Sequence, residues 1–271
     1  MLFLLTGYFS NAQTEQAAEK KKAEFKIGAN YNTSLNYYGR VDSLRSSGFF
    51  PLAEIWFNES FYINAAPVFV NNAEASFQYS GTITTIGYQF RANESWFGNI
   101  YLVKPFYEES SELVQAALKA QTGMTFTWLN KILNITGGAD IKFSDKTDFG
   151  VLAALDHIFR WQLTDKSVLV IDPSAYINAG TQQFTRSYLK KTSGFLFFPG
   201  TEQLVTESAN KFNILSYEFL APVIFATGKL HLIFTPAYVI PQNLLIVEGR
   251  PDLSEKGGKM FYATFGAKMS F

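Results

Sequence analysis

The C-terminal stretch MFYATFGAKMSF (Met260–Phe271) separates into two faces when every second residue is taken. Such an alternation predicts a β-strand whose two faces meet different environments, although a strand of a soluble sandwich has the same pattern. One parity is mostly polar or small. The other parity is wholly apolar and consists of Phe261, Ala263, Phe265, Ala267, Met269 and Phe271.

The same two-faced pattern recurs along the chain, for example in FKIGANYNTSLNYYG (25–39), VQAALKAQTGMTFTW (114–128) and ILNITGGADIKF (132–143). Runs of this kind between turn signals predict about twelve strands. The connections between them alternate between short turns such as NES (58–60) and longer loops such as RVDSLRSSG (40–48). The expected spans are 24–38, 49–57, 60–71, 79–91, 95–107, 113–129, 132–144, 148–162, 167–184, 211–226, 230–247 and 260–271.

Composition excludes several other classes of protein. The formal net charge is zero, which gives no general basic surface for nucleic acid. The absence of cysteine excludes disulfides, thiolate metal sites and a lipidated N-terminal cysteine. No apolar run approaches the roughly 20 residues that a spanning helix needs.

Long amphipathic strands, an even strand count and alternating short and long connections predict an all-β fold. The expected architecture is a transmembrane antiparallel up-and-down β-barrel of about twelve strands in a bacterial outer membrane, with short periplasmic turns and longer extracellular loops. Residues 24–271 would form this single domain, with both termini in the periplasm. Pro67, Pro173 and Pro236 predict bulges or bends in its wall, because proline removes a ladder donor.

The N-terminal segment MLFLLTGYFSNAQ carries an apolar stretch followed by Ser10 and Ala12. These small residues occupy the two positions that signal peptidase reads, so residues 1–12 are expected to be a signal peptide cleaved after Ala12. The usual basic region is missing, so we expect either a truncated signal or a start upstream of Met1, and a buried first strand is the alternative interpretation. Residues 13–23 are charged and read as a solvated periplasmic lead-in.

The four tryptophans provide an independent indication, because each lies within a few residues of an expected short turn. Aromatic residues gather at the membrane interfaces of outer-membrane barrels. The predicted girdle consists of Trp56, Trp96, Trp128, Trp161 and Phe271.

The terminal FYATFGAKMSF, with Phe271 last, resembles the C-terminal signal by which the barrel-assembly machinery recognises outer-membrane proteins. The NAQ region (11–13) resembles the cleavage region of exported proteins in the Bacteroidota. The resemblance is to a broad class and carries no functional residues. It implies that the last strand is read during insertion and closes the barrel on the first strand.

Charged residues on the other parity are expected to project into the lumen with both signs interspersed, where they must be paired or hydrated. His231 and Glu218 fit either a hydrogen-bonded lumen pair or, less favourably, the acid–base pair of a hydrolase, since no motif places a nucleophile. The predicted lumen charges are Lys26, Glu54, Arg91, Lys119, Asp140, Lys142, Asp156, Arg160, Asp172, Glu218, His231 and Lys268.

The long connection between Thr185 and Asn210 carries an apolar run, Phe195, Leu196, Phe197 and Phe198. Exposed apolar clusters usually mark contacts. Three interpretations are open: a plug in the barrel mouth, a docking surface for a partner, or an extension of the flanking strands.

The sequence therefore favours a non-enzymatic barrel, first of all a structural or accessory subunit of an envelope complex with a largely filled polar lumen. A narrow, porin-like channel for small solutes is the alternative, and an outer-membrane hydrolase ranks third. No cofactor or metal is expected. The expected partners are outer-membrane lipid and lipopolysaccharide, the barrel-assembly machinery during insertion, and other envelope proteins, with no nucleic acid.

Overall fold

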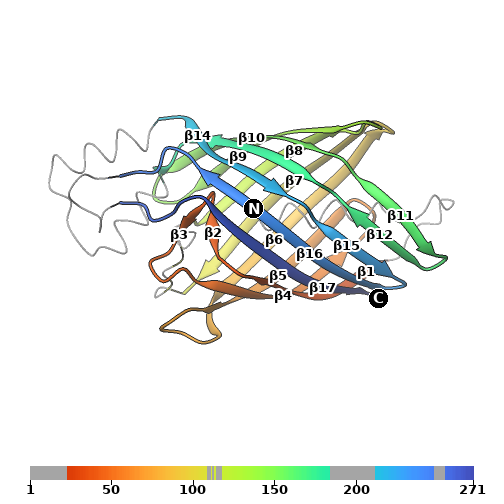
Figure 1. Cartoon of the computed structure of the whole chain (residues 1–271), viewed down its shortest axis with the longest axis horizontal. Helices are drawn as coiled ribbons and strands as arrows, with labels where there is room; N and C mark the ends of the chain where they lie inside the picture. The colour runs from red at the N-terminus through yellow and green to blue at the C-terminus, as the bar shows by residue number, and fades with distance from the viewer. Residues whose placement is uncertain (1–22, 109–110, 112, 114–117, 184–210, 247–253) are drawn as a thin grey trace.

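The computed structural model describes residues 23–108, 111, 113, 118–183, 211–246 and 254–271. Within this part of the chain, one antiparallel sheet closes on itself into a 12-strand barrel (Figure 1). The all-β barrel predicted from the alternating pattern is confirmed. Among the same residues there is no helix of the length and apolarity that crossing a bilayer requires.

Fifteen strand segments make up the twelve spanning strands, because three of these are interrupted and consist of β10 with β11, β12 with β13, and β14 with β15. β2 and β3 form a separate two-stranded sheet. The bounds are β1 (Glu24–Asn32), β2 (Asn36–Tyr37), β3 (Arg40–Val41), β4 (Ser47–Trp56), β5 (Phe61–Asn71), β6 (Gln78–Asn93), β7 (Trp96–Tyr107), β8 (Ala120–Trp128), β9 (Asn134–Phe143), β10 (Thr147–Asp156), β11 (Phe159–Thr164), β12 (Ser167–Ile171), β13 (Ser174–Gly180), β14 (Asn213–Leu220), β15 (Val223–Thr227), β16 (Leu230–Pro241) and β17 (Met260–Ser270).

The barrel closes where β1 pairs with β17. The antiparallel register runs from Lys26 opposite Ser270 to Asn32 opposite Thr264. At the end of this seam the Phe271 amide donates to the Phe25 carbonyl over 2.8 Å. The stretch that predicts the fold is therefore the strand that joins the two sides of the sheet at the seam.

Short turns join the strands at one end of the barrel, the right-hand end in Figure 1, where the C-terminus also lies. Asparagine side chains shape several of these turns. The Asn58 side-chain oxygen accepts hydrogen bonds from the Ser60 and Phe61 amides, both over 2.8 Å. Such Asx turns satisfy backbone donors locally, which is why NES reverses the chain in so few residues.

Three neighbouring strands are interrupted along one line of the wall. The backbone ladder crosses the breaks through irregular hydrogen bonds, from His157 to the Pro173 carbonyl over 3.3 Å and from Asp172 to the Pro222 carbonyl over 3.0 Å. The Ala221 amide extends the line to the Pro236 carbonyl over 3.1 Å. Proline has no N–H to donate, so the ladder is interrupted at Pro173 and Pro222, whereas β16 continues through Pro236 with its pairing to β17 unbroken.

The predicted proline irregularities differ from one position to the next. Pro173 lies at a strand break, as expected. Pro236 and Pro67 both lie inside continuous strands, β16 and β5, and Pro67 is followed by a register shift between Val68 and Phe69. The break at Pro222 was not expected from the sequence.

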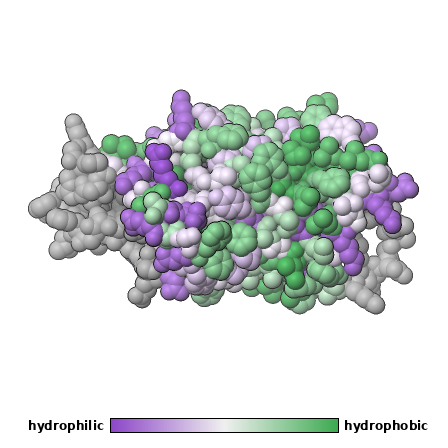
Figure 2. All heavy atoms as spheres, turned by 60° about the horizontal axis from the view of Figure 1, so that its bottom comes forward, coloured by the Kyte–Doolittle hydropathy of each residue, from purple (hydrophilic) through white to green (hydrophobic). Residues whose placement is uncertain are grey.

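The outer surface of the wall is apolar. Along β17 the side chains of Phe261, Phe265 and Met269 are exposed, whereas Tyr262 and Lys268 on the other parity are buried. Figure 2 shows hydrophobic residues gathered over the part of the barrel toward the short turns, with hydrophilic residues over the long-loop end. This distribution is the one a strand wall needs to face lipid.

We expect the substitution Gly28→Ala to lower the temperature at which the barrel unfolds. The measurement heats samples to increasing temperatures before electrophoresis and follows the loss of the compact, fast-migrating band. A Cβ at Gly28 would lie 2.6 Å from the Ala267 carbonyl oxygen, so the closing seam between β1 and β17 would have to shift. The matched control is Gly137→Ala, because a Cβ there meets no atom within 4 Å. Equal transition temperatures for the two variants would show that the seam tolerates displacement.

Candidate functional site: the lumen and an inward-folded hairpin

The inward faces of the strands carry a largely polar set of buried side chains. Alternation places every second residue inside, where the wall shields it from solvent. These residues mix amides, hydroxyls and charges of both signs. They include Lys26, Glu54, Asn64, Thr85, Gln89, Asn99, Thr125, Thr127, Thr136, Asp140, Lys142, Asp148, Asp156, Asn178, Ser216, Glu218, Thr235, Thr264 and Lys268.

One charge cluster crosses the closing seam. Glu54 on β4 is only 1% exposed, and its Oε1 lies 3.8 Å from the Lys26 Nζ and 3.7 Å from the Lys268 Nζ. The Trp56 indole Nε1 donates to the same oxygen over 2.7 Å. A buried carboxylate is thereby shared by two cations and a neutral donor from three consecutive strands, which compensates its loss of hydration.

A second set of charges lies on β9 and β10. Lys142 donates through its Nζ to Asp140 on the same strand, and Asp148 is the cross-strand neighbour of Lys142. Asp148 also accepts hydrogen bonds from the Thr181 hydroxyl over 2.5 Å and from the Gln183 amide over 2.6 Å. The carboxylate therefore fixes the segment that leaves β13 at the long-loop end.

A third polar group surrounds Glu218 on β14. Its Oε1 accepts hydrogen bonds from the Ser216 hydroxyl over 3.0 Å and from the Asn178 side-chain amide over 3.3 Å. Asn178 also donates to the Ser216 hydroxyl over 3.1 Å. Hydrogen bonds to a buried carboxylate offset its desolvation, so these neutral neighbours stabilise Glu218 in the interior.

The connection between β1 and β4 folds into the lumen as a hairpin, which we define as residues 33–46. β2 and β3 pair through Asn36 with Val41 and Tyr37 with Arg40, around a turn at Tyr38 and Gly39 that both have positive φ. Positive φ at two consecutive turn residues is typical of the tightest β-hairpins. Gly39 also passes close to the Pro241 ring, where a Cβ would come within 2.9 Å.

Arg40 anchors this hairpin across the lumen and is 2% exposed. Its Nε donates to Glu255 over 3.0 Å, and its Nη2 donates to the Gln182 side chain over 2.7 Å. Three carbonyls accept the remaining hydrogen bonds, those of Tyr38 and Leu215 over 3.2 Å each and that of Gln242 over 3.1 Å. Guanidinium has five N–H donors, so the bonding capacity of the group is fully used.

The anchor for Arg40 is itself held in place. Glu255 Oε2 accepts a hydrogen bond from the Leu245 amide over 2.7 Å, and the Glu255 amide donates to the Leu245 carbonyl over 2.8 Å. The Val41 amide donates to the Lys256 carbonyl over 2.9 Å. The hairpin and the segment before β17 therefore form one hydrogen-bonded unit at the mouth.

A cavity of about 80 Å³ lies between the hairpin and the wall. Tyr37 and Tyr38 of the hairpin line it together with Asn99 and Asp140 of the wall. Thr85 also lines it, and its buried hydroxyl has no hydrogen-bond partner among the described protein groups. The lining is mixed, with polar groups beside apolar side chains such as Ile83 and Val103, and the cavity is large enough for several water molecules. The hairpin and the wall therefore leave a cavity between them rather than packing solidly against each other.

The structure brings most of the predicted lumen charges inside. Buried in the interior are Lys26, Glu54, Asp140, Lys142, Asp156, Glu218 and Lys268, and half-buried are Asp172 and His231. The Asp156 carboxylate accepts a hydrogen bond from the Asn134 side chain over 2.7 Å.

Three predicted lumen charges are wrong, because Arg91, Lys119 and Arg160 are exposed. Arg91 and Lys119 have the inward parity but lie at strand ends, where side chains reach solvent past the rim; Lys119 forms a surface ion pair with Asp145 over 2.8 Å. Arg160 lies on β11, whose residues are all exposed. Parity fixes the direction of a side chain but not whether the wall surrounds it.

The predicted girdle is wrong at one tryptophan. Trp96, Trp128 and Trp161 are exposed on the wall, and Phe271 is exposed at the end of β17. Trp56 instead points inward, is 3% exposed and stacks on Tyr62 with ring centroids 4.7 Å apart. It lies two positions after Glu54 on β4, so both side chains must share one face.

His231 and Glu218 do not form the predicted neighbouring pair. His231 lies opposite Ala226 and Lys268, whereas Glu218 lies opposite Val239 farther along β16. The acid–base arrangement considered for a hydrolase is therefore not assembled. Among the described residues there is also no cluster of three or more histidine and acidic side chains suited to a metal ion.

The segment Phe195–Phe198, predicted as a plug, a docking surface or a strand extension, lies outside the described residues. The hairpin that does enter the lumen was missed, because the sequence placed 24–38 in one strand and 40–48 in an external loop. The turn-forming Tyr38 and Gly39 were the available signal.

A closed antiparallel barrel with an apolar outer wall and a polar interior is a transmembrane β-barrel of the outer-membrane type. No protein-family model and no curated protein matches the chain. Among solved structures it is similar to a KdgM porin, with 7% identity, TM-score 0.49, and 91% of this chain and 99% of that chain covered. It is also similar to an outer membrane channel from Pseudomonas putida F1 (10% identity, TM-score 0.49, 96% and 100% covered) and to LpxR from Salmonella typhimurium (6%, 0.49, 90% and 99%). These matches assign no substrate or activity to the chain.

We expect Glu54→Gln to lower the free energy of unfolding by about 3 kcal/mol, because the change leaves Lys26 and Lys268 facing a neutral amide in a buried site. The control Glu94→Gln removes an exposed carboxylate from a short turn and should change stability by less than about 0.5 kcal/mol. Urea titration of the detergent-folded barrel, followed by tryptophan fluorescence, measures both. Equal midpoints for the two variants would contradict the role assigned to Glu54.

Proposed function

We propose that the chain is a non-enzymatic integral protein of a bacterial outer membrane whose lumen is closed by its own hairpin, and that it serves as a structural or accessory component of the cell envelope. The observation that carries this proposal is the anchoring of Arg40. A guanidinium that uses all five donors inside the mouth fixes the hairpin across the lumen.

The membrane location follows from the wall. The ladder closes where β1 pairs with β17, and exposed Phe, Ile, Leu and Trp side chains cover the outside. In the proposed orientation the short turns and both termini face the periplasm, and the longer loops face outward. Outer-membrane lipid and lipopolysaccharide would contact the wall, and the barrel-assembly machinery would read the terminal FYATFGAKMSF during insertion.

Closure of the lumen favours a structural role over an open pore. The hairpin contacts opposite parts of the wall, since Tyr37 and Tyr38 line a cavity with Asn99 and Asp140 while Arg40 binds the Leu215 carbonyl. Buried charges beneath it are paired or hydrogen-bonded, as in the cluster around Glu54. Other envelope proteins are the proposed partners of such a closed barrel.

A gated channel for small solutes is the second candidate. It is supported by the cavity beneath the hairpin and by the noncovalent nature of the Arg40 anchor. In this alternative the hairpin would leave the mouth and open a narrow path. A hydrolase ranks below both candidates, because His231 and Glu218 lie at separate positions of the wall.

We expect the purified wild-type barrel to show no conductance steps in a planar bilayer, whereas Arg40→Ala should conduct. The substitution leaves Glu255 and four other acceptors without their donor, which releases the hairpin. The matched control Arg45→Ala removes an exposed arginine from the same hairpin and should remain closed. Steady conductance of the wild-type protein would contradict the closed-barrel proposal and favour the channel.

A further inference from the structure

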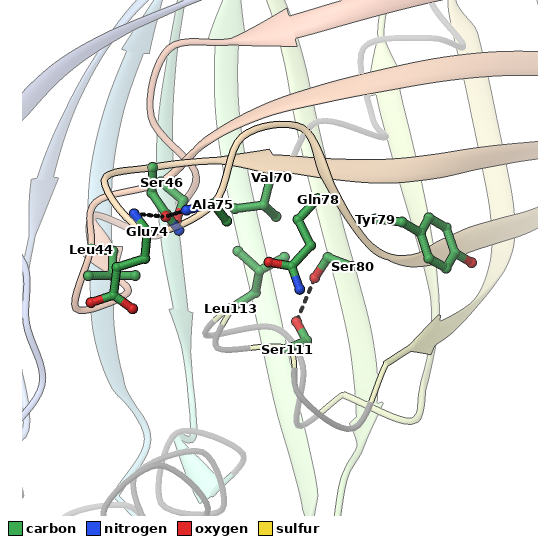
Figure 3. Close-up of a pocket in the computed structure, with 11 residues that line it drawn as sticks. Leu44, Ser46, Val70, Glu74, Ala75, Gln78, Tyr79, Ser80, Ser111 and Leu113 are labelled. Carbon is green, nitrogen blue, oxygen red and sulfur yellow. Dashed lines mark hydrogen bonds between the residues drawn. The ribbon is translucent and has the colours of Figure 1, made fainter.

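A second cavity, of about 210 Å³, opens at the mouth of the barrel on the side away from the Arg40 anchor. The hairpin supplies Leu44 and Ser46 to one wall of this mouth pocket, and the β5–β6 loop supplies Asn72 and Glu74. The opposite wall is formed by Gln78 and Ser80 of β6 together with Ser111 and Leu113, and the remaining lining residues are Val70, Ala75 and Tyr79 (Figure 3).

The pocket is held open by local hydrogen bonds rather than by chance packing of loops. Asp42 accepts hydrogen bonds from the Leu44 amide over 2.8 Å and from the Ser46 amide over 3.1 Å. The Asn72 side-chain amide donates to the Ser46 hydroxyl over 3.0 Å, and its oxygen accepts from the Ala75 amide over 2.8 Å. The hairpin wall and the loop wall are thereby fixed to each other.

Polar groups that remain available face the pocket from the other wall. The hydroxyls of Ser80 and Ser111 share one hydrogen bond of 2.7 Å, which leaves the pair one further donor and free lone pairs. Figure 3 shows the Gln78 side chain directed toward this serine pair, whereas Tyr79 points away. The site therefore offers donors and acceptors at short spacing, which suits a ligand with several hydroxyl groups.

The floor of the pocket is apolar. Val70 and Leu113 are buried and belong to a hydrophobic cluster that also contains Ile83 and Val103. A pyranose ring has the matching division of surface, with C–H groups on one face and hydroxyls around its edge. Apolar contact below and hydrogen bonds at the sides are the usual composition of a small-molecule site.

Charge selects among hydroxylated ligands. Glu74 is the one ionised side chain among the described lining residues, and no lysine or arginine is among them. An anionic sugar would meet this carboxylate without a compensating cation, and a single carboxylate is too few ligands for a tightly held divalent cation. We infer that the mouth pocket is a binding site for an uncharged sugar ring presented from outside the barrel.

The test is saturation-transfer NMR on the full-length barrel in a detergent without a sugar headgroup, such as lauryldimethylamine oxide. The probes are the methyl glycosides of glucose, galactose and mannose, N-acetylglucosamine, and glucuronate as the anionic comparison. At least one neutral probe should bind with millimolar affinity, and glucuronate should bind at least about tenfold more weakly, since like charges repel at close range.

Two variants locate the binding. Gln78→Ala and Ser80→Val remove hydrogen-bonding groups from the pocket. Each should lower the affinity for the neutral probe by about fivefold to tenfold. The control Gln162→Ala changes an exposed glutamine on β11 at the opposite end and should bind like the wild type. The compact band on an unheated gel verifies that each variant is folded.

Three results would overturn the inference: no binding of any neutral probe, binding of glucuronate equal to that of the neutral sugars, or unchanged binding in both pocket variants. None of these results bears on whether the lumen conducts. The pocket and the closed-barrel proposal can therefore fail independently of each other.

Discussion

Closure of the backbone ladder is the constraint on which the rest of this structure depends. In lipid no water is present to bond a free amide or carbonyl, so a sheet can span the bilayer only if its first and last strands pair. β17 meets this requirement through seven paired positions with β1 and a longer register with β16. Once the sheet is closed, alternation sends apolar side chains outward and leaves the remainder to fill the interior. β11 is an exception: among the described residues it pairs only with β12, and its side chains are exposed on both faces.

The closed wall creates a second problem, because charged groups are enclosed in a small space. At the seam, opposite charges compensate one another: Glu54 lies between Lys26 and Lys268. This charge cluster also joins β4, β1 and β17. The buried Glu218 carboxylate is instead stabilised by hydrogen bonds from the neutral side chains of Ser216 and Asn178. Both solutions are costly to disturb from one side, since removing a single partner leaves a buried charge uncompensated.

Much of this architecture could be predicted from the sequence, because period-two alternation and turn chemistry are local properties. The strand count, the closing role of Met260–Phe271 and most inward charges follow from them. The inward orientation of Trp56 also follows from alternation, because Trp56 shares a parity with Glu54. Its position near a short turn indicated the girdle instead. Arg91 and Arg160 were misplaced because parity carries no information on how far neighbouring strands extend. The Arg40 anchor was not predictable, since its acceptors on Gln182, Leu215, Gln242 and Glu255 come together only after the barrel has closed.

The choice of arginine at the anchor is itself informative about the mouth. An apolar side chain at this position would remove one hydrogen bond each from the Leu215 and Gln242 carbonyls and from the Glu255 carboxylate, and each lost hydrogen bond costs on the order of 1 kcal/mol. Lysine would supply three donors from a single point, too few for acceptors that lie in several directions. Only a planar group with five donors reaches all of them while remaining 2% exposed. The hairpin is therefore held by directional hydrogen bonds and not by apolar burial alone. Because such bonds require one geometry, they fix one arrangement of the mouth, and they do so without a covalent link.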